Sequence, residues 1–190
     1  MNGALRYKCH QSIVHGVMLS LCLGLTLPVM AQQATIGKTD AAFLNTAAER
    51  QQSEIQLGQL AVERAESEQV KQFAQRMVQD HTKASQEISN LATTIGITLS
   101  ETKDKGDQQQ MGKLSSLSGP QFDRAYVKHE MSDHKKTVSE FAAKSKALKN
   151  PQIRAWASAT LPMLKEHLSL ANGLASKPAK AGAKKTGTQG

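Results

Sequence analysis

Three histidines and two glutamates in this sequence have the residue types and the spacing to bind a metal ion in a helical core. If each residue turns a helix by about 100°, His81 falls near the centre of an apolar stripe on its segment. Glu54, His134 and His167 fall among apolar residues on three other segments. Glu130 lies at the edge of the stripe that contains His134. Imidazole and carboxylate together suit divalent transition metals, so these positions predict a candidate metal site.

The same residues also fall at one height of a helical bundle. Glu54 precedes the end of its predicted helix by about as many residues as His81 follows the start of the next one. His134 and His167 lie near the middle of their own segments. At a rise of about 1.5 Å per residue, the side chains are expected within about one turn of a single layer.

The chemistry of such a layer leaves two interpretations open. Two carboxylates buried without a partner cost much free energy, so they need protonated histidines, hydrogen bonds or a cation. In the first interpretation the layer binds one divalent transition metal ion, with Zn²⁺, Fe²⁺ or Cu²⁺ as the candidate cofactor. In the second, these side chains and Tyr126 form a satisfied polar network that only fixes the helix register. The candidate ligands are Glu54, His81, Glu130, His134 and His167.

Residues beside these histidines are interpreted as structural. Asp80 and Asp133 directly precede two of them, but adjacent helical residues point about 100° apart, so neither aspartate can orient the ring that follows it. Both are expected to be surface charges, and His129 is expected to be exposed. Three methionines within a turn of a histidine are expected to fill the core rather than to bind copper. They are Met77, Met131 and Met163.

The composition favours an all-α fold that can position such a layer. Aromatic residues make up 4% of the 190 residues, and runs of β-branched residues are scarce, which argues against sandwich, barrel and Rossmann folds. Capping and breaking residues predict four long helices, over about 40–66, 67–95, 118–149 and 151–173. Asp40, Ser67 and Asn150 are the expected N-caps, Gly96 ends the second helix, and Pro162 is expected to kink the fourth.

The connection between the second and third long helices is long and polar. It runs from Gly96 to Gly119, with a short helix expected over about 107–117. At about 3.3 Å per residue it can cross the full height of a bundle, so the helices that it joins can be parallel, as in ferritin-like folds. The predicted polar layer forms whether they run parallel or antiparallel. The sequence therefore predicts a ferritin-like four-helix bundle over residues 40–175.

Both ends of the chain differ in composition from this bundle. Residues 1–31 have the basic start, the apolar run and the Val29-Met30-Ala31 ending of a cleaved signal peptide, followed by a short linker over 32–39. Cys9 and Cys22 lie within it, so the mature chain is expected to lack cysteine and to be exported, periplasmic or secreted. Residues 176–190 form a basic tail that is expected to be disordered and solvated, with weak contact with an anionic envelope surface as the alternative. No specific nucleic-acid motif is present.

Several blocks of the sequence resemble a known bacterial family. EIQLGQLAVERA, VKQFAQRMVQDHTKA, LSGPQFDRAYVKHEMSDHKKTV and ATLPMLKEHLSLA stand in order between Asp40 and Leu174. They are similar to the exported domain of unknown function 4142, often labelled "predicted outer membrane protein". The resemblance implies a ferritin-like four-helix fold in a secreted protein and brings no established activity. The label finds no support here, because neither alternating barrel strands nor a lipidated cysteine can be recognised.

The motifs do not predict an enzyme. Ferritin-like di-iron proteins use Glu-x-x-His on two helices, but the residues three before the candidate histidines are Val78, Met131 and Leu164. No nucleophile or nucleotide motif occurs, so no catalytic residue is predicted. Three functions stay open: a binding or stress-related envelope protein with a metal site, a structural or interaction protein whose polar layer sets register, and a metal-dependent redox enzyme.

Overall fold

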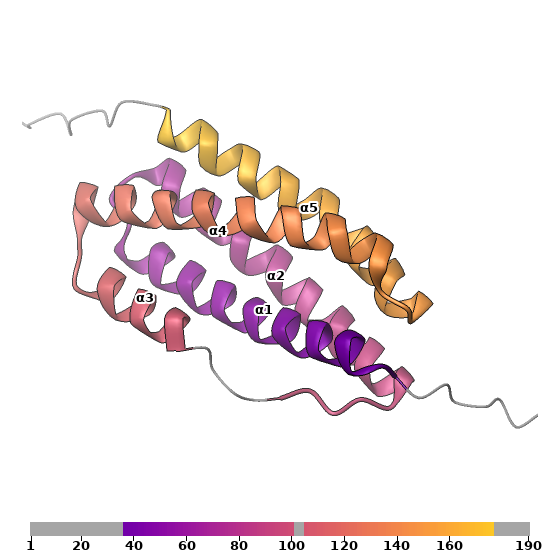
Figure 1. Ribbon diagram of the computed structural model, residues 1–190. Helices are drawn as coiled ribbons and strands as arrows, with labels where there is room; N and C mark the ends of the chain where they lie inside the picture. Colours follow the sequence, from indigo (N-terminus) through magenta and orange to yellow (C-terminus); the bar gives the residue numbers. More distant parts are fainter. Residues whose placement is uncertain (1–35, 101–104, 177–190) are drawn as a thin grey trace, which may run out of the picture. The chain divides into compact units, whose positions relative to one another are not determined.

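The computed structural model describes residues 36–100 and 105–176, and in these residues the chain is all-helical, as predicted (Figure 1). The long helices are α1 (Lys38–Arg64), α2 (Glu68–Ile95), α4 (Gly119–Ala147) and α5 (Pro151–Ala175), and the short α3 (Lys105–Ser115) lies in the long connection. The predicted signal peptide, residues 32–35 of the linker and residues 177–190 of the basic tail lie outside the described residues.

The helices begin and end close to the predicted capping and helix-breaking residues, with one error. The Asn150 side chain accepts hydrogen bonds from the backbone N–H groups of Gln152 and Ile153 and so caps α5. Gly96 ends α2 in the left-handed conformation, with φ 74°, which glycine adopts without a steric penalty. Asp40 is not the N-cap of the first helix, because α1 begins at Lys38 after Gly37.

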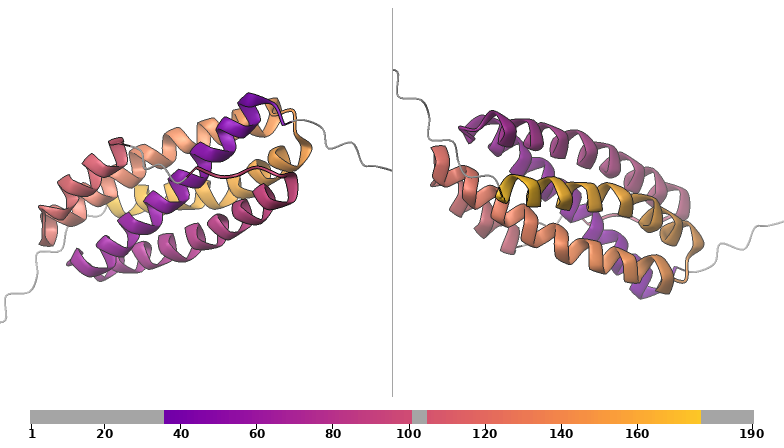
Figure 2. Two further views of the ribbon diagram at one scale, coloured as in Figure 1. Left: turned by 90° about the horizontal axis from the view of Figure 1, so that it is seen from below. Right: turned by 90° about the horizontal axis from the view of Figure 1, so that it is seen from above.

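Two helical hairpins build the bundle. α1 packs against α2, and α4 packs against α5. The hairpins meet where α1 contacts α4 and α2 contacts α5, so the four long helices form a ring in the order α1, α2, α5, α4. Figure 2 shows the four helices side by side from two opposite directions.

Two aspartates join the hairpins at opposite ends. The carboxylate of Asp40, near the start of α1, accepts hydrogen bonds from the backbone N–H of Asn150 at 2.5 Å and of Lys149 at 3.3 Å, between α4 and α5. Asp123, near the start of α4, accepts from Glu66 at 3.0 Å and Ser67 at 2.8 Å, between α1 and α2. Asp123 thus binds the backbone of the predicted cap Ser67, whose own side chain makes no capping hydrogen bond.

The two contacts also fix the direction of the helices. The start of α4 lies at the start of α2, so these helices run parallel, which is one of the two directions that the sequence allowed, and the chain crosses the height of the bundle between them (Figure 1). Two antiparallel hairpins joined by one long crossover are the connectivity of ferritin-like bundles.

The interior consists of two apolar clusters. One contains Phe43, Leu44, Phe141 and Trp156 at the end of the bundle where α1 begins. The other is built from the first turns of α2 and α4 and the last turns of α1 and α5, with Leu57, Phe73, Met77, Phe122 and Tyr126 among its members. Along every long helix the predicted polar residues fall between these clusters, so apolar side chains close their layer from both ends.

Pro162 does not end the last helix. α5 runs from Pro151 to Ala175, and both Pro162 and Ser158, whose carbonyl would have received the missing hydrogen bond, lie on its exposed face. Water can therefore satisfy that carbonyl. Among the helices of the described ranges, none is both long and apolar enough to span a membrane.

Candidate metal centre

The structure brings all five predicted site residues into one buried layer. Glu54 comes from α1, His81 from α2, Glu130 and His134 from α4, and His167 from α5. Each of these residues is at most 3% exposed. All four long helices therefore contribute a polar group to a part of the core that solvent scarcely reaches.

The three imidazole rings form a nearly equilateral triangle. Their centroids are 5.6 Å apart for His81 and His134, 5.1 Å for His81 and His167, and 5.4 Å for His134 and His167. One nitrogen from each ring lies within 4.8 Å of the other two. Nitrogens that share a single ion at about 2.0–2.1 Å lie about 3.3–3.6 Å apart, so the rings would have to move inward to bind one ion together.

Each ring donates a hydrogen bond through one nitrogen to an oxygen that can only accept. His81 Nδ1 lies 2.7 Å from Gln51 Oε1, His134 Nδ1 lies 3.1 Å from the backbone oxygen of Glu130, and His167 Nε2 lies 2.9 Å from Asp80 Oδ2. The orientation of the Gln51 amide is set by its nitrogen, which donates to Ala47 O at 3.4 Å.

These three acceptors fix the tautomers of the rings. The proton of each neutral ring lies on the nitrogen that faces its acceptor, so the other nitrogen carries a lone pair. Those nitrogens are His81 Nε2, His134 Nε2 and His167 Nδ1, and all three are buried without a hydrogen-bond partner. In metal proteins a ligating histidine almost always donates its second ring N–H to such an oxygen.

The two carboxyl groups lie against the ring of His134. Oxygens of Glu54 and Glu130 and a nitrogen of His134 lie within 4.8 Å of one another, and His134 Nδ1 is 3.5 Å from Glu130 Oε2. Burial raises the pKa of Glu130 to about 8. Burial and the negative charges of Glu130 and Asp133 raise the pKa of Glu54 well above its usual value. The pair therefore retains protons at neutral pH when no cation compensates its charge.

The histidines have the opposite tendency. Burial and the neighbouring His167 lower the pKa of His134 to about 4, and burial with the other two rings lowers the pKa of His81 well below its usual value. The pKa of His167 is also lowered by burial, although Asp80 opposes the shift. All three rings are therefore neutral at pH 7, which is the form that binds a metal.

Unpartnered polar atoms are concentrated in this layer. Eight buried side-chain atoms of the described residues lack a hydrogen-bond partner, and seven of them belong to the five site residues and to Tyr126. The eighth is Trp156 Nε1. Because buried polar groups in proteins are nearly always satisfied, the three unpartnered histidine nitrogens make this layer a candidate ligand site.

Two expectations about neighbouring residues are wrong. Asp80 is not simply a surface charge: although partial burial acts to raise its pKa, hydrogen bonds from His167 and Arg76 lower it. Asp80 cannot orient His81, as expected, but it orients His167 across the bundle. His129 is half-buried rather than exposed, and burial lowers its pKa. Sequence reasoning also missed Gln51, whose place beside Glu54 on the inward arc of α1 was the available signal.

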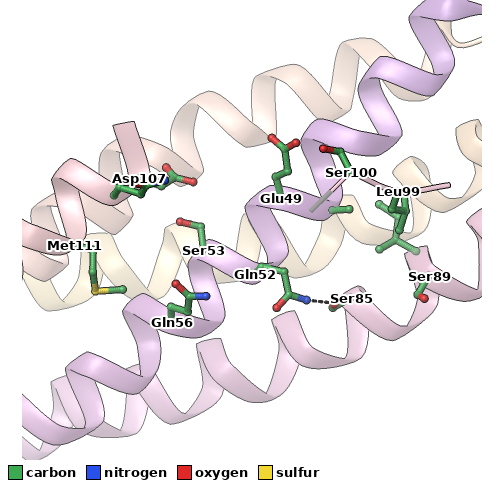
Figure 3. A pocket seen from close by; sticks show the side chains of 13 residues that line it. Glu49, Gln52, Ser53, Gln56, Ser85, Ser89, Leu99, Ser100, Asp107 and Met111 are labelled. Atoms are coloured by element: carbon green, nitrogen blue, oxygen red, sulfur yellow. Dashed lines mark hydrogen bonds between the residues drawn. The ribbon is translucent and has the colours of Figure 1, made fainter. Parts of the chain in front are cut away.

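A small pocket of about 260 Å³ reaches the layer from outside. Its walls come from α1, α3 and α4 and include Glu49, Arg50, Glu54, Asp107, His129 and Asp133. A larger hollow of about 700 Å³ adjoins it and shares Glu49, Ser53 and Asp107 with it. Figure 3 shows this larger hollow between α1 and α2, with Gln52 bonded to Ser85. It contains none of the five site residues.

The sequence matches the family DUF4142, a domain of unknown function, over residues 25–174. This chain belongs to the DUF4142 family. The predicted resemblance is thereby confirmed. No curated protein matches the sequence.

Solved structures show the same fold in a second family. A DUF305 fragment from Deinococcus radiodurans superposes with a TM-score of 0.66 and 13% identity, covering 74% of this DUF4142 chain and 97% of the fragment. A DUF305 protein from Streptomyces coelicolor that is presumed to be secreted gives a TM-score of 0.61 and 15% identity, covering 71% of this chain and 90% of that one. At these identities the likeness establishes the fold alone.

Proposed function

We propose that this protein is an exported metal-binding protein of the bacterial envelope. One divalent transition metal ion is held by His81, His134 and His167, and Glu54 and Glu130 supply carboxylate oxygens beside it. Zn²⁺, Fe²⁺ and Cu²⁺ are the candidates, because each accepts imidazole together with carboxylate. The signal peptide predicted over residues 1–31 and the presumed secretion of the Streptomyces DUF305 protein support the location.

The observation that carries this proposal is the orientation of the three rings. Gln51, Asp80 and the backbone oxygen of Glu130 each hold the proton of one ring, which leaves one buried and unpartnered lone pair on every ring. The three rings lie within reach of one another, and a cation bound to these lone pairs would give each of them a partner. A network that only fixed helix register would instead pair each nitrogen with a donor.

The charges of the layer favour a divalent ion. The three neutral rings contribute no charge, so a divalent ion would bring two uncompensated positive charges into the core. Two ionised carboxylates, Glu54 and Glu130, balance this charge when they release their protons. Metal binding is therefore coupled to proton release, as is usual where ligands must be deprotonated.

Equilibrium binding to the mature protein, purified without a histidine tag, tests the proposal. Metal analysis of the isolated protein and calorimetric titration with Zn²⁺, Fe²⁺ and Cu²⁺ should show one ion per chain. Free metal at about 100 times the dissociation constant should stabilise the fold by about 2.7 kcal/mol. His81→Ala should abolish both binding and the metal-dependent stabilisation.

Ile88→Ala is the matched control, because Ile88 is buried on the same helix and lies outside the layer. It should lower the stability as any cavity does and leave metal binding unchanged. If the wild-type protein binds none of the three ions and its melting temperature ignores both metal and chelator, the proposal is wrong.

A further inference from the structure

We propose that the small pocket between α1, α3 and α4 is the route by which a divalent cation reaches the three-histidine centre, with Glu54 as the first buried ligand that it meets. This inference rests on the proposed function and adds the path to the site. It starts from the fact that the centre is closed at both ends by apolar clusters and must be reached from the side.

Glu54 belongs to both the pocket and the buried layer. It is 3% exposed, it lines the pocket, and its Oε2 has no hydrogen-bond partner. Of the two hollows on this side of the bundle, only the smaller one includes a residue of the centre. The unpartnered oxygen thus stands where the pocket meets the core.

A continuous series of donor atoms leads from Glu54 to the histidines. Oxygens of Glu54 and Glu130 and a nitrogen of His134 lie within 4.8 Å of one another, and His134 belongs equally to the three-histidine group. His134 links the two groups, so a cation can pass from the carboxyl oxygens of Glu54 and Glu130 to the lone pair of His134 Nε2, and then to His81 and His167. Ligands along this path offset the cost of a bare charge in a low-dielectric core.

The composition of the pocket favours cations. Four of the residues that line it carry a carboxyl group, namely Glu49, Glu54, Asp107 and Asp133, whereas Arg50 is its one arginine. The charge of Arg50 is shared with Asp133 at 3.9 Å and Glu140 at 3.5 Å. His129 adds a half-buried imidazole to the wall. Carboxyl groups outnumber basic side chains in this lining, and an excess of negative charge in a cleft raises the local concentration of cations and their association rate.

The test measures the rates of Co²⁺ binding and release by stopped-flow absorbance in the mature protein. Ser53→Trp places a bulky side chain in the pocket wall and should slow association and dissociation by the same factor, leaving the dissociation constant unchanged. If the ion enters and leaves by the same path, an obstacle in that path must slow association and dissociation equally. Ser89→Trp is the matched control, because Ser89 lines only the larger hollow, and it should leave both rates unchanged.

A charge variant keeps the test independent of how Ser53→Trp folds. Glu49→Gln with Asp107→Asn should lower the association rate about tenfold at low ionic strength and weaken its salt dependence. Glu63→Gln with Glu87→Gln removes two exposed carboxylates outside the pocket and should leave the rate as in the wild type.

The outcomes separate the two proposals. If the pocket variants bind Co²⁺ with wild-type rates and affinity, the proposed metal centre is supported and the proposed entry route is wrong. If the wild-type protein binds no Co²⁺ and none of the three candidate metals at equilibrium, the centre itself is wrong and the route falls with it.

Discussion

At the scale of single residues, the carboxyl groups and the histidines of the layer have opposite effects on how the stability of the fold depends on pH. The pKa of Glu130 is raised to about 8. Between about pH 4.5 and pH 8 this carboxyl is therefore protonated in the native protein and ionised in the unfolded chain. The pKa of His134 is lowered to about 4. Between about pH 4 and pH 6.5 this ring is therefore neutral in the native protein and protonated in the unfolded chain. Stability therefore rises with pH through the histidine and falls with pH through the carboxyls.

Between about pH 6.5 and pH 8 only the carboxyl effect remains, so the metal-free protein should lose stability as the pH rises. The expected slope is of the order of 1 kcal/mol per pH unit for each proton released. Urea unfolding in the presence of chelator measures it. Glu54→Gln with Glu130→Gln should flatten the slope, whereas Glu63→Gln on the exposed face of α1 should preserve it. An unchanged slope in the double variant would show that neither carboxyl holds a native proton.

The residue that orients His167 gives a second prediction. Asp80→Asn keeps an acceptor near His167 Nε2 but removes the negative charge that supports the ring as a ligand. Metal affinity should fall about 10–100-fold, measured by competition with a chromophoric chelator. Glu87→Gln, an exposed acid on the same helix, should bind metal as the wild type does. Equal affinities for Asp80→Asn and the wild type would remove Asp80 from the site.

Helical phase could find the five site residues but not the acceptors that orient them. Phase depends only on the sequence of one helix, so the burial of His81, His134 and His167 was predictable. The contacts of Asp80 and Gln51 depend on which neighbouring helix each faces and on the rotation of that neighbour. Asp80 is turned away from His81, and nothing in the sequence of α2 alone shows that it reaches α5.

At the scale of elements, the close approach of α1 and α2 depends on a glycine. A Cβ atom at Gly58 would lie 2.8 Å from Val78 Cγ2 and 3.2 Å from the backbone oxygen of Ala74. Val78 is β-branched and has little freedom to move, and the Ala74 oxygen belongs to the helix itself. The first hairpin can therefore pack at its observed distance only with glycine at this position.

Gly58→Ala should destabilise the protein by about 1–3 kcal/mol, because the clash outweighs the higher helix propensity of alanine. Gly112→Ala on α3 is the matched control, since nothing lies within 4 Å of its added methyl group. This control should be neutral or more stable by up to about 1 kcal/mol. Chemical denaturation measures both, and a Gly58→Ala protein as stable as Gly112→Ala would show that the two helices can separate without cost.

Helix boundaries could be predicted to within about two residues where glycine, proline or asparagine marks the end. Gly96, Asn150 and Pro151 did so because their backbone preferences act locally. The predicted N-cap at Asp40 was wrong, because an aspartate near the start of a helix can either cap its own helix or bind the backbone of another segment. Its partners lie about 110 residues further along the chain, and only the packing of the two hairpins reveals them.

At the scale of the whole molecule, the length of the crossover allows the parallel course of α2 and α4, and the contact of Asp123 with Ser67 shows it. The pocket that reaches Glu54 could not be predicted in the same way. Its walls come from three helices, and one of them, α3, belongs to the connection rather than to the ring of four. The position of such a short helix depends on its packing against α1 and α4, which local sequence does not specify.

Because the layer receives a ligand from each of the four long helices, bound metal should stabilise the molecule as one unit. Protons compete with the metal for the two carboxyls, and the proton of Glu130 leaves as the pH approaches its pKa of about 8. The increase in melting temperature caused by Zn²⁺ should therefore grow from pH 6.5 to pH 8, while the metal-free protein loses stability over the same range. Calorimetry at both pH values measures the increments, and hydrogen exchange should show slower exchange in α1, α2, α4 and α5 together. An increment that is independent of pH, or protection confined to one hairpin, would mean that the carboxylates and the four helices do not share the ion.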